Sequence, residues 1–368
     1  MRINIKKIWL KGFRNLTETV LEWTPPKATL ILGENNQGKT NLLDALAFLL
    51  TGQSTQTTNL EDIIAIDQDE FTLVADLESK NTPTRLSIRY RRGGEMVVLR
   101  DQQVCTSFRS IKQEFPTVFI SSDIVYAFKD SPQIRRQNID RFCENYDPEF
   151  TAIKRQYDRL LKQKNSVLKD DNPTPETLQF WNQQLVPIAT KIVEHRIQAL
   201  HHIQTHYQTL VSNGNPLFDQ PLDIHYAALG ENKLDPTTYA EKLTQKYEEI
   251  MDKEIASGHN LAGPGRDDYT LILGGQNLFI YFSRGINKAV AFLLTLAQWE
   301  ALYHKLGAYP LLLLDDTFAE IDVRHKTWLC SLLTHKGQLI YTSVLPEDKL
   351  LFPDATHYHM IQGHLHHG

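Results

Sequence analysis

Residues 30–50 form the segment LILGENNQGKTNLLDALAFLL. It begins with apolar residues suited to a buried strand and ends with apolar residues repeated at helical spacing. Between them, Gly33 to Thr40 matches the pattern G-x-x-x-x-G-K-[ST]. Glycines let the backbone wrap a phosphate, and the start of the following helix adds N–H donors. Because strand, loop and helix follow in the required order, we favour a phosphate-binding loop (P-loop) over a chance glycine turn.

Each position of this loop has an expected role. Lys39 should neutralise charge on the β- and γ-phosphates of ATP, and Thr40 should bind Mg²⁺. ATP and Mg²⁺ are therefore the expected cofactors. The residues of this segment expected to contact the nucleotide are Gly33, Glu34, Asn35, Asn36, Gln37, Gly38, Lys39, Thr40 and Asn41.

A second acidic element lies far downstream, where four leucines precede Asp315 and Asp316. A buried strand that ends in a carboxylate supplies the second metal ligand in P-loop proteins. A core strand running into an Asp-rich turn would look the same in isolation, but the P-loop favours the functional interpretation. We expect Asp315 to bind Mg²⁺ and Asp316 to orient or deprotonate the attacking water.

A third element, FSRGINKAVAFLLTLA, precedes the acidic strand. Ser283 and Gly285 begin a helix there and offer a hydroxyl and backbone amides to an anion. An ordinary N-cap serine is an equally good local interpretation. Two helix starts of one chain are not expected to reach the same γ-phosphate. We therefore expect a head-to-tail dimer in which Ser283 of each subunit completes the partner's catalytic site.

Composition restricts the classes of protein. Hydrophobic residues make up 41% and charged residues 23% of the 368 residues, as in soluble globular proteins of two or three lobes. The apolar runs are far shorter than the roughly 18 residues of a membrane span, and the charged N-terminus does not resemble a signal peptide. The three cysteines form no CxxC pair, so neither a disulfide framework nor a zinc site is indicated. We expect a cytoplasmic protein with no membrane partner.

The C-terminal segment HYHMIQGHLHHG is rich in histidine. Histidines can bind metal, but no acidic or cysteine ligand accompanies them here. A solvated histidine-rich tail is therefore the favoured interpretation.

Secondary-structure patterns divide the chain into three parts. Residues 1–130 and 251–368 contain most of the apolar strand patterns, including antiparallel strands with a turn at Gly93-Gly94. Residues 131–250 are mainly helical, starting from Ser131 and Pro132. We expect an α/β ATPase head formed by 1–130 and 251–368, with 131–250 inserted as a helical lobe.

Together, the P-loop, the Ser-x-Gly helix start and the late acidic strand resemble the ABC-type ATPase heads of chromosome-maintenance and repair proteins. Within that group the chain resembles the RecF family over nearly its whole length. The further stretches that carry this resemblance are GFRNL, TVFISSDIVYAFKDSPQIRRQNIDRFCENYDPEF, GPGRDD and LLLLDDTFAEID.

The resemblance implies an ABC-type head, a mixed sheet with flanking helices, and an inserted second lobe. It also implies a slow, DNA-stimulated ATPase of recombination, replication and the SOS response to DNA damage. Such a protein would form ATP-dependent homodimers on duplex DNA near gaps and assist recombinase loading with RecO- and RecR-type partners. Asp322 would contact the partner subunit across the nucleotide. The chain differs from the family pattern at Asn36, usually glycine, and at Ile286-Asn287-Lys288, usually Gln-Gln-Arg.

DNA binding would depend on local basic patches, because the net charge is -5. A solvated charged face is an equally good interpretation of each patch, and no base-reading module is present, so binding would be independent of sequence. Lys164 and Lys169 lie in the same helical stretch as the patch that begins at Lys154. The candidate DNA contacts are Arg89, Arg91, Arg92, Arg135, Arg136, Lys154, Arg155, Arg159 and Lys162.

Two other functions fit the same motifs. One is an ABC-type ATPase regulator or defence protein that acts on a protein target, with the basic patches incidental. The other is a scaffold that hydrolyses ATP weakly and uses it to hold a dimer together. ATP-dependent, salt-sensitive binding to duplex DNA distinguishes the repair function from both.

Overall fold

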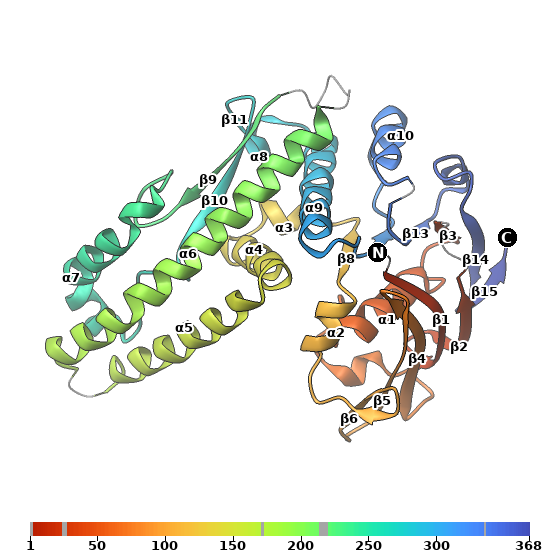
Figure 1. The fold of residues 1–368 in the computed structure, drawn as a ribbon, viewed down its shortest axis with the longest axis horizontal. Helices are drawn as coiled ribbons and strands as arrows, with labels where there is room; N and C mark the ends of the chain where they lie inside the picture. Colours follow the sequence, from red (N-terminus) through yellow and green to blue (C-terminus); the bar gives the residue numbers. More distant parts are fainter. Residues whose placement is uncertain (1–2, 24–27, 171–172, 213–219, 335) are drawn as a thin grey trace. The chain divides into compact units, whose positions relative to one another are not determined.

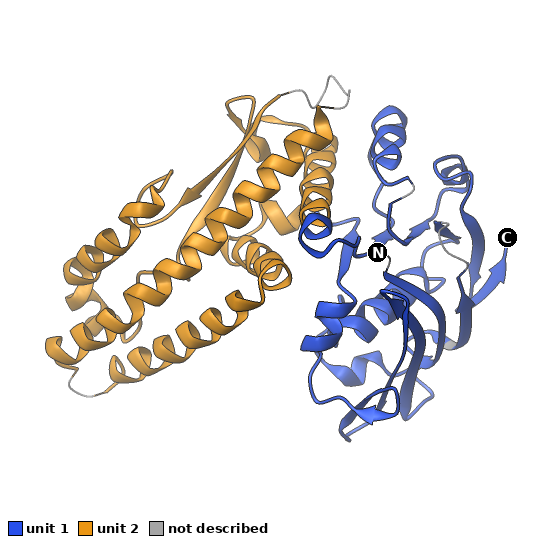
Figure 2. Cartoon of the chain, viewed as in Figure 1, with its two compact units in different colours: residues 1–124, 302–368 blue, residues 125–301 orange. Residues whose placement is uncertain are grey.

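The computed structural model describes residues 3–23, 28–170, 173–212, 220–334 and 336–368. The chain forms two compact units, unit 1 from Met1–Ile124 and Leu302–Gly368 and unit 2 from Val125–Ala301 (Figure 2). Unit 1 is thus built from both ends of the chain, as a head with an inserted lobe would be. The inserted part extends beyond the expected 131–250, because segment 251–301 packs with unit 2.

A six-stranded sheet of unit 1 carries the P-loop, in the strand order β15-β14-β3-β13-β12-β8. All neighbouring pairs are parallel except β14 with β15. Because parallel strands bring their carboxyl ends to one edge, the loop after β3 lies beside the ends of β12 and β13. The strands are β3 (Thr29–Leu32), β8 (Thr117–Ser121), β12 (Leu311–Asp315), β13 (Leu339–Ser343), β14 (Thr356–Ile361) and β15 (His364–His367).

A second sheet of unit 1 is antiparallel, in the order β2-β1-β4-β5-β6-β7. In β4, buried residues alternate with partly exposed ones, the pattern of a strand with one face in a core. The expected turn at Gly93-Gly94 is confirmed, since it joins β5 to β6. The strands are β1 (Ile3–Phe13), β2 (Leu16–Glu22), β4 (Glu70–Ser79), β5 (Thr82–Arg91), β6 (Met96–Arg100) and β7 (Gln103–Val104).

Helix α1 (Lys39–Thr51) contacts strands of both sheets. Its residues from Leu42 to Leu50 are all buried, which explains why the sequence is apolar on every side of the helix. Phe48 packs edge-on against Phe71 of β4, with ring centroids 5.6 Å apart. The helix that starts at the P-loop is therefore the centre of the unit 1 core.

Gln338 ties the two sheets of unit 1 together. Its side chain accepts a hydrogen bond from Ile5 N at 2.7 Å and donates one to Ile5 O at 3.0 Å. The pairing of β1 with β4 is irregular between Ile5 and Lys7, so a side chain satisfies the backbone groups of Ile5. These two hydrogen bonds hold the start of β1 against the start of β13.

The remaining elements of unit 1 are short. The structure shows α2 (Arg109–Glu114), α10 (Val323–Ser331), η1 (Leu60–Ile63) and η3 (Pro346–Leu350). The histidine-rich C-terminus is not a solvated tail. It forms β14 and β15, which belong to the parallel sheet, so that prediction was wrong. Within the described ranges, no group of three or more His, Cys, Asp or Glu side chains could hold a metal ion.

Unit 2 consists of helices around a three-stranded antiparallel sheet, β11-β10-β9 (Figure 1). Helices α5 and α6 pack side by side, and α6 continues through Pro187. Strand β10 pairs antiparallel with β11, which is short and is followed by helix α8. The elements are α3 (Tyr126–Lys129), α4 (Pro132–Tyr146), α5 (Pro148–Val167), α6 (Pro175–Val211), β9 (Leu222–Ala227), η2 (Pro236–Thr238), α7 (Tyr239–Ser257), β10 (Asp268–Leu273), β11 (Gln276–Asn277), α8 (Leu278–Tyr281) and α9 (Arg284–Leu306), which continues into unit 1.

No helix in the described part of the chain is long and apolar enough to cross a membrane.

Candidate nucleotide-binding site

The P-loop backbone needs residues that tolerate unusual conformations. Gly38 has φ 110° and Asn36 has φ 63°, both in the left-handed region that glycine and asparagine adopt most readily. A Cβ on Gly33 would lie 2.6 Å from Met360 O of β14, and one on Gly38 would lie 2.9 Å from Asn15 Oδ1. The loop therefore keeps its shape only with glycine at both positions.

Lys39 lies across this loop. Its Nζ donates hydrogen bonds to Gly33 O at 2.7 Å and to Glu34 O at 2.8 Å. Burial lowers the pKa of Lys39, and the nearby carboxylates of Asp316 and Asp315 act in the opposite direction. Among the described residues Lys39 has no ion pair, so its charge is held by neutral carbonyls and remains available to a phosphate.

Thr40 and Asp315 meet at the carboxyl edge of the parallel sheet. Thr40 Oγ1 donates to Asp315 Oδ1 at 3.1 Å, and Thr342 Oγ1 donates to the same oxygen at 2.7 Å. Burial raises the pKa of Asp315, while the hydrogen bonds from Thr342 and Thr40 act against this rise. A hydroxyl and a carboxylate are oxygen ligands that Mg²⁺ prefers.

Asp316 occupies the turn that follows β12. Its φ is 46°, a left-handed conformation that is uncommon for residues other than glycine. Its backbone N donates to Thr342 O at 3.1 Å and to Thr342 Oγ1 at 3.2 Å. Thr342 of β13 thus bonds to both acidic residues, a role that the sequence does not indicate because a mostly apolar strand with one threonine carries no distinctive pattern.

Residues distant in sequence also brace the P-loop. Asn15 Nδ2 donates to Asn36 O at 3.2 Å, and Asn41 Nδ2 donates to Asn15 Oδ1 at 2.7 Å. Gln37 is bonded to the turn between β14 and β15, where Gln362 N donates to Gln37 Oε1 at 2.6 Å. Asn41 therefore faces Asn15. Asn15 belongs to the GFRNL stretch, which the sequence already marks as a family motif. No sequence pattern indicates the contact of Gln362 with the P-loop.

These residues fit a magnesium nucleotide. The glycine loop leaves no room for added Cβ atoms, Lys39 carries an unpaired charge, and the Thr40 hydroxyl lies against the Asp315 carboxylate. Thr40 and Asp315 would hold Mg²⁺, and the loop amides would hold phosphate oxygens.

The Ser283 segment belongs to unit 2. Ser283 is exposed, and its Oγ accepts a hydrogen bond from Ile286 N at 3.4 Å, which is the geometry of an N-cap for α9. Gly285 is partly exposed in the first turn. Asn287 and Lys288, which differ from the family pattern, are each only 4% exposed. Of the changed residues, Asn287 and Lys288 are therefore buried and Ile286 is partly exposed, whereas Ser283 is exposed.

Asp322 caps helix α10 of unit 1. Its Oδ1 accepts hydrogen bonds from the backbone N of Arg324 and His325, both at 3.1 Å. Its side chain is 58% exposed and also contacts His325 Nδ1. Hydrogen bonds to the carboxylate outweigh desolvation and lower the pKa of Asp322. The residue is ionised and accessible, as a contact across a subunit interface requires.

The hairpin arginines of unit 1 differ in their partners. Arg89 forms a bidentate ion pair with Glu70, with its shortest N–O distance 2.7 Å, and Arg92 lies 3.8 Å from Glu61. Arg91 is exposed and has no ion pair in the described part of the chain. Exposed ion pairs of this kind contribute little free energy and exchange readily for other anions.

Arg135 and Arg136, at the start of α4, are engaged inside unit 2. Arg135 Nε donates to Asp268 Oδ1 at 2.8 Å, and the same guanidinium also contacts the carbonyls of Lys129 and Asp130. Arg136 Nη1 donates to Asp267 O at 2.7 Å. Arg135 thus has a structural role within unit 2. Arg136 uses one N–H group in its hydrogen bond to Asp267 O.

Helix α5 presents some of its cations to solvent and buries another. Lys154 pairs with Asp158 at 2.7 Å, whereas Arg155, Arg159 and Lys162 are exposed without ion pairs among the residues described. Lys164 is fully buried and bonds to Glu254 at 2.7 Å. Of the further cations of this stretch, Lys164 is therefore not available to DNA, while Lys169 is exposed.

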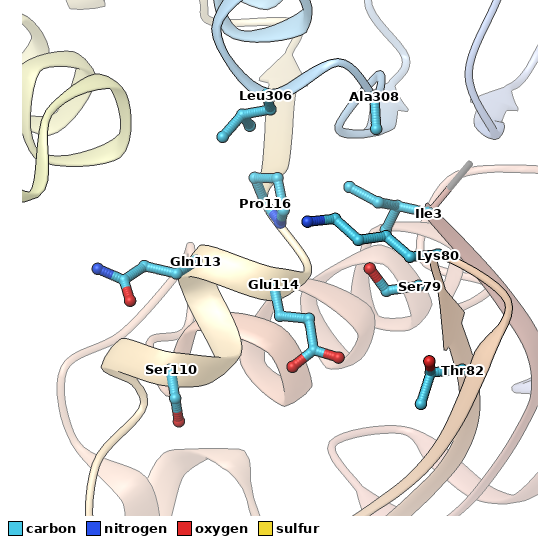
Figure 3. A pocket seen from close by; sticks show the side chains of 10 residues that line it. All are labelled: Ile3, Ser79, Lys80, Thr82, Ser110, Gln113, Glu114, Pro116, Leu306 and Ala308. Atoms are coloured by element: carbon cyan, nitrogen blue, oxygen red, sulfur yellow. The ribbon is translucent and has the colours of Figure 1, made fainter. Parts of the chain in front are cut away.

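A cavity of about 460 Å³ in unit 1 lies apart from this site (Figure 3). Pro116 and Ala308, which line it, precede β8 and β12, so the cavity is at the amino ends of these strands. The P-loop is at their carboxyl ends. The cavity thus contains none of the nucleotide residues.

A P-loop after a central parallel strand, a buried carboxylate at the end of the second strand along the sheet, and a helical second unit define an ABC-type P-loop ATPase head. The sequence profile of the RecF/RecN/SMC N terminal domain family matches residues 4–350. The chain therefore belongs to the RecF/RecN/SMC family.

Known relatives agree with this assignment over almost their full lengths. The "DNA replication and repair protein RecF" of Protochlamydia amoebophila is 28% identical over 349 residues, which cover 94% of this chain and 95% of the relative. The protein of the same name from Geobacillus sp. (strain WCH70) is 28% identical over 97% of this chain and 96% of its own.

Solved structures show the same fold. A structure of the recombination mediator protein RecF with ATP has a TM-score of 0.87 at 23% identity and covers 100% of this chain and 98% of its own. An SmcHead bound to the C-winged helix domain of ScpA has a TM-score of 0.59 at 14% identity and covers 98% of this chain and 95% of its own.

Proposed function

We propose that this protein is an ATP-dependent DNA-binding ATPase of recombinational repair and replication. The observation that carries the proposal is the Thr40–Asp315–Thr342 cluster beside an intact P-loop, since it supplies both protein oxygens of a magnesium nucleotide site. The names of the relatives, which are replication and repair proteins, support the biological role.

Nucleotide binding would use unit 1. Lys39 and the amides of Gly33–Thr40 would bind phosphate oxygens, and Thr40 with Asp315 would hold Mg²⁺. The metal would neutralise charge on the β- and γ-phosphates. Asp316, beside Asp315 and fixed by Thr342, would orient the attacking water and accept its proton.

Completion of the site would require a second copy of the chain. Ser283 and Gly285, at the exposed start of α9, would contact the γ-phosphate bound by the other subunit. Asp322 would contact the partner across the nucleotide. Hydrolysis would be slow and stimulated by DNA, and ATP would control assembly of the head-to-tail dimer.

Duplex DNA would bind to the exposed cations without regard to sequence, near gaps. Arg91, Arg155, Arg159 and Lys162 have no ion pairs among the described residues and are the strongest candidates. The surface pairs of Arg89, Arg92 and Lys154 would exchange carboxylate for phosphate. We omit Arg135, because its guanidinium is engaged within unit 2. Assistance to a recombinase in the cytoplasm, with RecO- and RecR-type partners, is the remaining part of the proposal.

Fluorescence anisotropy of a labelled gapped duplex tests this function. With ATP and Mg²⁺ we expect binding that weakens by orders of magnitude between about 50 and 200 mM salt and is lost without nucleotide. A Lys39→Ala variant should bind as the nucleotide-free protein does. Duplex binding equal with and without ATP, or absent in both cases, would contradict the proposal.

A regulator with a protein target is the second candidate. The observation in its favour is that several cations of the predicted DNA patches are engaged within the chain, and that the net charge is -5. ATP-dependent capture of a protein with no salt-sensitive duplex binding would favour it.

A further inference from the structure

The loop Gly263–Asp268, sequence GPGRDD, is held from inside unit 2 by an extensive polar network. Asp267 is only 2% exposed, and its Oδ2 accepts hydrogen bonds from Tyr226 Oη at 3.0 Å and Tyr239 Oη at 3.2 Å. Buried polar groups of this kind stabilise a fold only when they are satisfied. The carboxylate of Asp267 thus anchors the loop to the sheet and to helix α7.

Two arginines hold the backbone of the same loop. Arg196, itself 2% exposed, donates from Nη1 to Pro264 O at 2.7 Å and pairs with Asp140. Arg136 Nη1 donates to Asp267 O at 2.7 Å. Side chains of α4 and α6 therefore fix the main chain on both sides of Gly265 and Arg266.

The turn itself is tight. Arg266 N donates to Gly263 O at 2.8 Å, and Gly263 has φ 106°. A Cβ on Gly263 would lie 2.9 Å from Tyr157 Oη. The Tyr157 side chain therefore packs against the turn at Gly263, and the turn has one backbone conformation.

This rigid support presents two residues to solvent, Gly265 and Arg266. A Cβ on Gly265 would meet nothing within 4 Å, so the space above the turn is open. Within the described ranges, the Arg266 guanidinium has neither a hydrogen bond nor an ion pair. A fixed backbone that ends in an arginine without a partner is the arrangement expected of an anion-binding residue.

The cations around the turn differ in their engagement. Arg135 bonds to Asp268, Arg136 to Asp267 O and Arg196 to Asp140, whereas the Arg266 guanidinium has no such partner among the described residues. Burial raises the pKa of Asp267 to about 6, while Arg196 and the hydrogen bonds from Tyr226 and Tyr239 act in the opposite direction. Burial and the neighbouring Arg196 lower the pKa of Arg136, as expected where cations are crowded together.

We propose that the Gly263–Arg266 turn is a contact site for a phosphate of the DNA backbone, with Arg266 as the residue that binds it. A guanidinium presents paired N–H donors that match a phosphate. The exposed residues of the turn include no apolar or aromatic side chain that could anchor a protein partner, which favours a positioning contact to phosphate. This inference rests on the proposed duplex binding.

Duplex anisotropy with ATP and Mg²⁺ tests the site in the wild type and in Arg266→Ala, Arg266→Lys and Arg141→Ala variants. Arg141 is a matched control, because it is an exposed arginine of unit 2 with no ion pair among the described residues. Loss of one phosphate contact should lower duplex affinity about tenfold in Arg266→Ala and reduce the slope of log affinity against log salt by about 0.9. Arg266→Lys should recover the slope, Arg141→Ala should bind as the wild type, and binding of a fluorescent ATP analogue should stay unchanged in all four proteins.

The outcomes separate this inference from the function on which it rests. If Arg266→Ala retains the wild-type affinity and slope while the wild type binds duplex, the phosphate site is wrong and the DNA-binding function stands. Equal losses in Arg141→Ala and Arg266→Ala would overturn the site as well, because they would reveal a general charge effect. If the wild type does not bind duplex at all, both proposals fail.

Discussion

Thr40 Oγ1 donates a hydrogen bond of 3.1 Å to Asp315 Oδ1, although the two residues lie 275 positions apart in the sequence. Both stand at the carboxyl edge of one parallel sheet, Thr40 in the helix that follows β3 and Asp315 at the end of β12. The strand order, with β13 between β3 and β12, brings these two ends within reach of each other. The pair couples the phosphate loop to a carboxylate, which is the arrangement on which the proposed Mg²⁺ site rests.

The first prediction concerns this pair. Asp315→Asn removes the charge that Mg²⁺ requires but keeps an oxygen for the Thr40 hydrogen bond. We expect at least about a tenfold loss of ATP affinity in the presence of Mg²⁺ and little change in EDTA, measured by titration with a fluorescent ATP analogue. A Thr40→Ser control should retain affinity in both conditions. An equal loss with and without Mg²⁺ would show that Asp315 has another role.

The second prediction concerns Thr342, whose hydroxyl donates to Asp315 and accepts from Asp316 N. Thr342→Val keeps the shape but removes one hydrogen bond from each group, while Asp316 N keeps its bond to Thr342 O and Asp315 keeps its bond from Thr40, at a cost of about 1–3 kcal/mol of stability. We expect kcat for ATP hydrolysis to fall at least about tenfold with a smaller change in ATP affinity, because Asp316 is held by one hydrogen bond fewer. Thr342→Ser should restore kcat, and a valine variant with unchanged kcat would contradict this role.

The third prediction separates stability from DNA binding at Lys164. This side chain is fully buried beside Glu254, so Lys164→Met leaves an unpaired buried carboxylate. We expect the free energy of unfolding to fall by about 3–5 kcal/mol, measured by urea denaturation. Adding Glu254→Leu should recover much of this loss. Where the Lys164→Met protein remains folded, the salt dependence of its duplex binding should match that of the wild type. A reduced slope of log affinity against log salt would mean that Lys164 contacts DNA.

The fourth prediction concerns pH. Burial raises the pKa of Asp267 to about 6, although Arg196 and two tyrosines stabilise its charge. The folded state therefore binds a proton more tightly than the unfolded state, whose Asp pKa is about 3.9. This contribution to stability is complete below about pH 4 and is lost as the pH rises to about 6, by about 3 kcal/mol.

Asp267→Asn removes this titration and provides the comparison. The unfolding free energy of the wild type minus that of the variant should fall by about 3 kcal/mol between about pH 4 and pH 7. If the difference in unfolding free energy between the two proteins stays constant over this range, the pKa of Asp267 is not raised by folding.

The sequence predicted those parts of the site that are local. The P-loop, its helix and the acidic strand each have a pattern within a few residues, and parallel strands bring such ends together. Thr342, Asn15 and Gln362 act through tertiary pairing, and no local pattern distinguishes a threonine that orients a carboxylate from one that fills a strand.

Lys164 shows where charge patterns mislead. It lies seven residues after the buried Tyr157, so helical periodicity placed it on the buried face of α5. The presence of Glu254, 90 positions away, makes that burial tolerable, and a helix pattern cannot show this. The prediction for the C-terminal histidines was wrong for a similar reason. Composition suggested a solvated tail, but the pairing of β14 with β3 makes this segment part of the sheet.

The proposed function requires that ATP join two copies of this chain through the P-loop site of one and the Ser283 segment of the other. Light scattering of the wild type and of Asp316→Asn, each with and without ATP and Mg²⁺, measures this association. We predict the mass of one chain without nucleotide, a shift toward twice that mass with ATP, and a persistent dimer in Asp316→Asn because hydrolysis is blocked. A single-chain mass for both proteins in saturating ATP would contradict the claim.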